Sequence, residues 1–316
     1  MNLSERIEQT VSLCQESLAA ADLRGAEDFL VRRGLMKDAR LELLRASARA
    51  QRATPELTAL RDSLVAEVGS AAGTGSLERA LLVRAALRAM SQVPELPVDD
   101  SVKHLLCKEF AFYAKPPESA RDHFSLIQHV FFAMSKIVLL ERFPAGPSHW
   151  EVSGFPRKWL ARVAPRYMAS TYRFLAFETK GFKPFFVSHL GGTRNRMPAL
   201  IERDLRVAFY RSAVSIEQQP SIKGMMAGSW LHSLETHRVS PHLSCLNRPW
   251  LEAGGIYTDL GPADPDDGFL TGNSERAALY RTGEYKPTFG LVICSRDQAI
   301  AWKRAHPELE RLTAVR

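Results

Sequence analysis

The sequence predicts a mixed α+β or α/β protein in which a helical N-terminal region precedes a domain with a mixed sheet. Three observations predict this class. Apolar residues in the first third recur at helical spacing. From residue 182 onward, short aromatic and β-branched runs alternate with helical segments. The 316 residues, 45% of them apolar, suffice for two domains with separate cores.

We expect a helical bundle over 1–120, a helical and basic connecting region over 121–181, and an α/β domain over 182–316. In the bundle, Leu3, Ile7, Val11 and Cys14 repeat at helical spacing behind Asn2 and Ser4. The same criteria predict the following elements between residues 41 and 180: helices at 41–48, 55–68 and 77–90, a linker at 69–76, a helix at 124–142, a loop at 143–151, and helices at 156–164 and 166–180.

In the C-terminal domain the expected elements alternate between strands and helices. They are strand 185–190, helix 198–218, strand 224–231, loop 232–240, a helix opened by Ser240-Pro241, strand 256–260, helix 273–281, strand 288–294 and helix 297–305. Gly224 and Gly228 in the second strand predict the close approach of another backbone or a ligand.

Composition excludes several classes of protein. The longest apolar stretch, Leu126 to Leu140, is interrupted by His129 and Lys136 and is too short to span a bilayer. The first residues lack the basic start and apolar run of a secretory signal, so we expect a cytoplasmic protein. The four cysteines lie far apart without a C-x-x-C pair, which predicts reduced, buried thiols.

Charge is concentrated in one segment. Residues 157–206 hold eleven Arg or Lys against three Asp or Glu, a net charge of +8 in a chain whose total is +7. Eight aromatic residues are interleaved with these cations. Such a segment can bind nucleic acid, an anionic membrane surface or the phosphates of a cofactor. Alternatively, the cations form a solvated helix face and the aromatic residues are buried beneath it.

The run from Asn273 to Gly290 predicts a capped helix that carries Tyr280, a stop at Gly283, and a strand. This run resembles the helix of the GNAT-type N-acyltransferases whose tyrosine protonates a leaving thiolate. The order strand, loop, short helix, strand, loop, tyrosine-bearing helix, strand resembles the second half of the same fold. The resemblance covers residues 182–305. The segment 222–230 is in addition similar to bacterial proteins of unassigned activity.

The resemblance implies transfer of an acyl group from coenzyme A, or from a carrier-protein thioester, to an amine. The strands Met225–Leu231 and Ile256–Leu260 would splay apart to admit the pantetheine arm. Tyr280 would be the acid. The base would be Glu235, His237 or His232, the polar groups after the first of these strands. The acyl-coenzyme A would bind at Trp230, Arg238, Ser240 and Asn273.

Two features differ from the family pattern. The segment between His232 and Pro241 contains no glycine, whereas the family's phosphate loop is rich in glycine. A hairpin before the first central strand is not apparent, since a single strand, 185–190, is predicted ahead of the 198–218 helix.

Other chemistries have weaker support. His232, His237 and His242 with downstream aspartates offer enough ligands for a metal, but their spacing fits no helical His pair, and we expect no metal. Neither a Gly-x-Ser-x-Gly elbow nor a P-loop occurs. The alternative to an enzyme is a non-catalytic protein that recruits an anionic partner, nucleic acid or a membrane surface, through residues 157–206.

Overall fold

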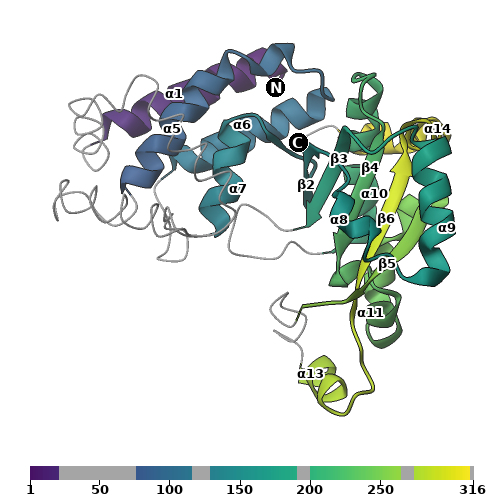
Figure 1. Cartoon of the computed structure of the whole chain (residues 1–316). Helices are drawn as coiled ribbons and strands as arrows, with labels where there is room; N and C mark the ends of the chain where they lie inside the picture. Colours follow the sequence, from purple (N-terminus) through teal and green to yellow (C-terminus); the bar gives the residue numbers. More distant parts are fainter. Residues whose placement is uncertain (21–75, 116–128, 191–199, 265–273, 314–316) are drawn as a thin grey trace. The chain divides into compact units, whose positions relative to one another are not determined.

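The computed structural model describes residues 1–20, 76–115, 129–190, 200–264 and 274–313 (Figure 1). Its internal contacts divide the chain into two compact units. Unit 1 comprises 1–96, 100–144 and 191–197, and unit 2 comprises 97–99, 145–190 and 198–316. The main division therefore falls at residue 145, inside the segment predicted to connect two domains, and the cationic helices after residue 156 belong to unit 2.

The described part of unit 1 is mainly helical. Its helices are α1 (Leu3–Ala19), α5 (Ser76–Met90), the short 3₁₀ turn η2 (Val93–Glu95), α6 (Asp100–Ala114) and α7 (His129–Val138). Asn2 caps α1 in a capping box with Glu5, as its sequence position predicts. α7 is the described part of the predicted 124–142 helix, and it ends early because Leu140 adopts a left-handed conformation (φ 56°). The elements predicted at 41–48 and 55–68 lie outside the described residues.

A six-stranded mixed sheet has the order β1-β2-β3-β4-β6-β5, so the predicted α/β class is confirmed. The strands are β1 (Arg142–Pro144), β2 (Ser148–Ser153), β3 (Phe185–Leu190), β4 (Gly224–Ser229), β5 (Ile256–Pro262) and β6 (Thr288–Ser295). β3 and β4 are parallel, whereas the β2–β3, β4–β6 and β5–β6 pairs are antiparallel.

The loop predicted at 143–151 is wrong, because these residues form the end of β1, a tight turn and much of β2. The turn is closed by a hydrogen bond from the Ala145 amide to the Ser148 carbonyl. The prolines and Gly146 belong to this turn and conceal the strands on either side. Trp150 on β2 is buried and stacks on Phe186 of β3 at 3.8 Å between ring centroids. A strand thus does precede β3.

Helices cover both faces of the sheet. One face carries α10 (Glu202–Glu217) and α12 (Arg248–Glu252), where Phe209 packs edge-on against Trp250. The other face carries α8 (Arg157–Leu160), α9 (Pro165–Arg173) and the π-helix η4 (Phe174–Glu178). The helix predicted at 166–180 is confirmed as α9 continuing directly into η4, whereas the helix predicted at 156–164 is reduced to the single turn of α8. Their buried side chains Phe155, Val163, Phe174 and Leu175 form one cluster with Phe185, Met226, Leu260, Leu291 and Ile293 of the sheet.

The loop predicted at 232–240 is also wrong, since most of it is helical. β4 ends at Ser229, whose hydroxyl accepts a hydrogen bond from the Leu231 amide and so begins a 3₁₀ turn. The remaining elements are η5 (Trp230–His232), α11 (Leu234–Val239), the 3₁₀ helix η6 (Pro241–Leu246), α13 (Ser274–Arg281), α14 (Arg296–Ala305), η8 (Pro307–Leu309) and α15 (Glu310–Thr313).

Two smaller predictions are confirmed. A Cβ at Gly224 would lie 2.4 Å from the Cys294 carbonyl oxygen, so this glycine does permit the close approach of a neighbouring strand. All four cysteines are buried and none forms a disulfide. No helix of the described ranges combines the length and apolar character needed to cross a membrane.

Candidate functional site

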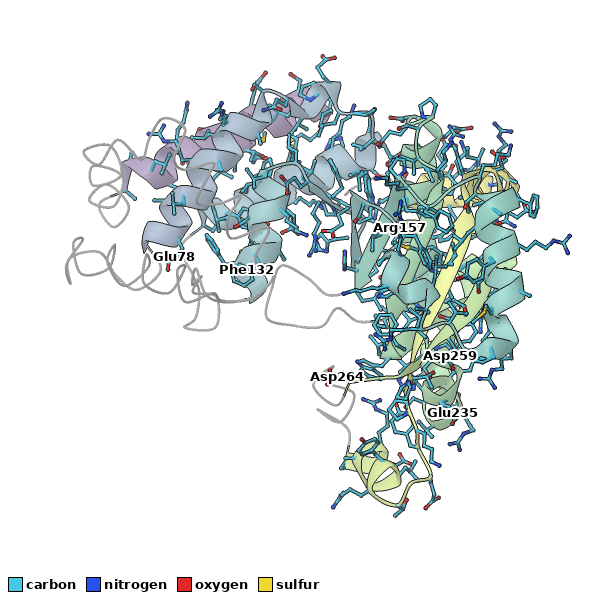
Figure 2. All side chains as sticks on the ribbon, in the orientation of Figure 1. Glu78, Phe132, Arg157, Glu235, Asp259 and Asp264 are labelled. Atoms are coloured by element: carbon cyan, nitrogen blue, oxygen red, sulfur yellow. The ribbon has the colours of Figure 1, made fainter. Side chains whose placement is uncertain are left out.

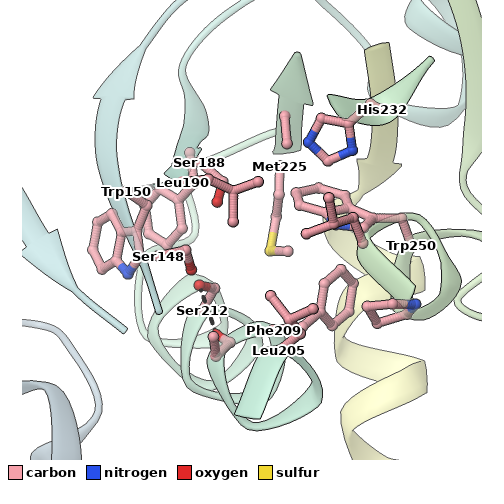
Figure 3. A pocket seen from close by; sticks show the side chains of 15 residues that line it. Ser148, Trp150, Ser188, Leu190, Leu205, Phe209, Ser212, Met225, His232 and Trp250 are labelled. Carbon is pink, nitrogen blue, oxygen red and sulfur yellow. Dashed lines mark hydrogen bonds between the residues drawn. The ribbon is translucent and has the colours of Figure 1, made fainter. Parts of the chain in front are cut away.

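A pocket in unit 2 lies between the sheet and α10, beside the carboxyl ends of β3 and β4 (Figure 3). Its enclosed volume is small, about 30 Å³, and the whole space between its walls, including open solvent, is about 490 Å³. Aromatic and aliphatic side chains form most of the wall, and the side chains of three serines and a histidine supply its polar groups. These polar residues are Ser148, Ser188, Ser212 and His232. A mostly apolar cavity with a few polar groups is the usual form of a small-molecule site.

The two parallel strands part beside this pocket. Their ladder runs from the Phe185–Gly224 pair to the Ser188–Ala227 pair and stops there, although both strands continue for two more residues. Beyond this point, β3 stays paired with β2 and β4 with β6. Within the described residues, therefore, the last two residues of each strand, 189–190 and 228–229, are not paired with each other across the β3–β4 edge.

His232, the last residue of the 3₁₀ turn η5 that follows β4, is the titratable residue of this pocket. Its Nδ1 lies 2.6 Å from Oδ1 of Asn247, whose Nδ2 donates to the His232 carbonyl oxygen at 3.0 Å. With that amide orientation, Nδ1 carries the proton and Nε2 keeps a lone pair. Burial lowers the pKa of His232 to about 4, an effect that outweighs the hydrogen bond to Asn247. The imidazole is thus neutral at pH 7.

The backbone at His232 is held by β6. A Cβ at Gly290 would lie 2.5 Å from the His232 carbonyl carbon and 2.6 Å from the Ser233 nitrogen. A side chain at position 290 would displace the segment that carries the histidine. Ser233 adds a hydrogen bond of 2.9 Å between its hydroxyl and that of Thr288.

The predicted base residues separate in the structure. His237 donates from Nε2 to the Leu231 carbonyl oxygen at 2.9 Å, and burial lowers its pKa. Glu235 lies on α11 and forms a 3.0 Å ion pair with Arg238, both being about half exposed (Figure 2). Of the three candidates, His232 lines the pocket and the other two do not.

Two of the predicted coenzyme-binding residues, Trp230 and Ser240, contact a buried arginine. Arg276 of α13 stands over the Trp230 ring at 5.1 Å and donates to the Ser240 hydroxyl at 3.3 Å. Arg238 instead donates to the Glu284 carbonyl oxygen as well as pairing with Glu235. None of these residues lines the pocket, and Asn273 lies outside the described residues.

Tyr280 is partly exposed on α13 and is not among the pocket-lining residues. The neighbouring Tyr285 is fully buried and shares a 2.8 Å hydrogen bond with the Thr236 hydroxyl. The sequence separates these two tyrosines by a glycine stop, but it does not show which one is enclosed.

The expectation that Met225–Leu231 and Ile256–Leu260 would splay apart is wrong, because β6 lies between β4 and β5 and pairs with both. The strands that part are β3 and β4. This pair could have been found from the sequence, since a strand, a 16-residue helix and a strand form a crossover unit that favours parallel pairing.

Asn247 was missed for a different reason. It precedes Arg248-Pro249 and thus has the sequence position of a helix cap, yet its side chain makes no cap hydrogen bond to α12. It binds His232 instead.

Comparisons with known proteins add no assignment: no family model, curated protein or solved structure matches this chain.

Within the described ranges, no group of three or more His, Cys, Asp or Glu is placed to hold a metal ion.

Proposed function

We propose that unit 2 transfers an acyl group from a coenzyme A or carrier-protein thioester to an amine, with the thioester bound where β3 and β4 part. The observation that carries the proposal is the opening of this parallel pair beside a pocket that contains a neutral histidine. An extended arm with amide groups, such as pantetheine, fits between parting strands because it can pair with both backbone edges.

The residues around the gap favour an apolar acyl group. Phe186, Met225 and Phe209 line the cavity, and burial of apolar surface stabilises a bound chain by roughly 25 cal/mol per Å². The serine hydroxyls can orient one polar group such as a thioester carbonyl. The resemblance to the GNAT-type acyltransferases adds to this proposal through the order of strands and helices.

His232 is the base in this mechanism. Its Nε2 takes a proton from the amine as the amine nitrogen forms a bond to the thioester carbon. The carbon–sulfur bond then breaks, and the thiolate leaves with a proton from an acid. Tyr280 is the acid expected from the sequence, although it lies on α13 and does not line the pocket. The Asn247 hydrogen bond keeps the His232 tautomer that has Nε2 free to accept.

Binding and turnover test the proposal separately. We expect coenzyme A or acetyl-coenzyme A to raise the melting temperature of the full chain, since a ligand at a hundred times its Kd adds about 2.7 kcal/mol of stability. Thiol release from acyl-coenzyme A, measured with a panel of primary amines, should fall about 10²–10⁴-fold in His232→Gln.

The matched control is His242→Gln, because His242 is exposed on η6 and does not line the pocket. It should keep wild-type turnover. Absence of both a thermal shift at millimolar coenzyme A and any amine-dependent thiol release would refute the enzyme.

A second candidate function follows from the surface of α9 and η4, which is cationic and apolar together. Phe177 is 72% exposed, Tyr172 42% and Met168 39%. Exposed cations of the same region include Arg157, Lys158, Arg173 and Lys180. We infer that this surface binds an anionic membrane, since aromatic side chains beside cations suit the headgroup region of a bilayer.

Vesicle co-sedimentation tests the second candidate. Phosphatidylcholine vesicles with added phosphatidylglycerol should bind the protein at low salt, and vesicles without it should not. Phe177→Ser should weaken binding, whereas Val152→Ser, at another exposed apolar position on β2, should not. Binding to single-stranded oligonucleotides and not to vesicles would mean that the partner of this surface is nucleic acid and not a membrane.

A further inference from the structure

A second cavity lies in unit 1, between α1 and α6, and is unlike the pocket of unit 2. It contains about 720 Å³ of empty space, part of it open to solvent. Its wall combines three cations with two uncharged polar residues and an aromatic ring. These are Arg6, Lys108, Lys115, Gln9, Thr10 and Phe112.

The helical repeat places these residues on one face of each helix. On α1, the positions of Arg6, Gln9 and Thr10 are three and four residues apart. On α6, Lys108 and Phe112 are one turn apart, and Lys115 follows directly after the helix. Packing of the two helices thus brings cations of both to the same cavity.

Two of these cations, Arg6 and Lys115, have no anionic partner among the described residues. The Nε of Arg6 is buried and has no hydrogen-bond partner, and within the part of the chain that the structure describes neither Arg6 nor Lys115 forms an ion pair. A buried polar group without a partner costs about 1–3 kcal/mol, and more when it is charged. Like charges that face one cavity add to this cost.

The nearby His104 is affected by the positive charge of the same cavity. The Nδ1 of His104, one turn before Lys108, is also buried without a hydrogen-bond partner. Burial lowers the pKa of His104, and the charge of Arg6 lowers it further. The carboxylate closest to this histidine along α6, Asp100, pairs with Lys103.

We propose that this cavity is a binding site for a phosphoryl group, held by Arg6, Lys108 and Lys115. A guanidinium and two ammonium groups attract the one or two negative charges of a phosphate diester or monoester, and the Arg6 guanidinium can donate to phosphate oxygens. Phe112 supplies an apolar surface for the organic part of the ligand. The phosphoryl group belongs either to a free small molecule or to a lipid headgroup.

Calorimetric titration of the full chain tests this site with three probes at constant ionic strength: inorganic phosphate, pyrophosphate, and phosphatidylcholine vesicles containing phosphatidic acid. We expect saturable binding of at least one probe. Arg6→Gln should weaken it about ten- to a hundredfold, since it removes a charged hydrogen bond. Lys115→Gln, at an exposed position, is the second variant in case Arg6→Gln does not fold.

The matched control is Arg88→Gln, which removes the same charge from an exposed position on α5 in the same unit. It should bind as the wild type does. Binding to vesicles alone, lost in Arg6→Gln, would assign the phosphoryl group to a lipid. No binding of any probe, or equal weakening in Arg88→Gln and Arg6→Gln, would overturn the proposal.

Discussion

The two faces of the sheet in unit 2 are built from alternate residues of the same strands, yet one face is filled and the other, the hollow face, borders the small pocket. Phe185 and Met226 point into a closed apolar cluster with the helices α8, α9 and η4. Their neighbours Phe186 and Met225 point into the pocket, where serines and His232 interrupt the apolar wall. All four side chains are at most 2% exposed, so burial alone does not distinguish the faces.

The difference shows where to look for chemistry in a fold of this kind. A face selected only for stability is packed at the density of an organic crystal and excludes polar groups without partners. The hollow face instead keeps empty space, a neutral imidazole and the open end of a parallel strand pair. These features reduce stability, and they lie beside the site that we propose for the thioester.

The largest expected effect concerns Tyr280, which lies outside the hollow face. As the acid expected from the sequence, Tyr280→Phe should lower turnover about 10²–10⁴-fold with little change in stability. Tyr285→Phe is the matched control and should lose about 0.5–1.5 kcal/mol of stability, because it removes the buried hydrogen bond to Thr236. Full turnover in Tyr280→Phe would mean that Tyr280 is not the acid and that the reaction depends on residues of the pocket.

The next prediction compares substitutions of two adjacent methionines whose side chains lie on opposite faces of the sheet. We expect Met226→Ala to lose stability near the upper end of about 2–5 kcal/mol, because it opens a cavity in a filled cluster. Met225→Ala should lose less, since its side chain already borders empty space. Urea unfolding of both variants measures the difference. Equal losses would mean that the two faces are packed alike.

The smallest effect is the pH dependence of stability contributed by His232. Its folded pKa of about 4 is below the unfolded value near 6.5, so the unfolded state binds more protons between these values. Stability should therefore fall as the pH decreases from 6.5 to 4, by up to about 1.4 kcal/mol per pH unit. In His232→Gln this slope should become shallower by that amount. An unchanged slope would show that the imidazole is hydrated and not enclosed.

Much of the fold could be predicted from local signals. The helices at 3–19 and 76–90 and the strands β3 to β6 follow from periodicity, caps and glycine stops. β2 could not be recognised in this way, because the proline-rich turn before it hides a short strand whose burial depends on contact between Trp150 and Phe186.

The site was predictable only in part. His232 was recognised as a polar group after a strand, but its distinction from Glu235 and His237 depends on burial and on Asn247, which is distant in sequence. The wrong expectation that β4 and β5 part from each other has the same origin. Strand order is a non-local property, and a pattern along the chain does not show that β6 inserts between β4 and β5.

The position of β6 has a consequence for biosynthesis. β4 and β5 leave the ribosome before Thr288–Ser295, yet in the finished sheet both pair with this strand. Until it is translated, each presents an open edge that can pair with another chain. The nascent protein must therefore keep these two strand edges from pairing with other chains during the time needed to synthesise the residues up to Ser295.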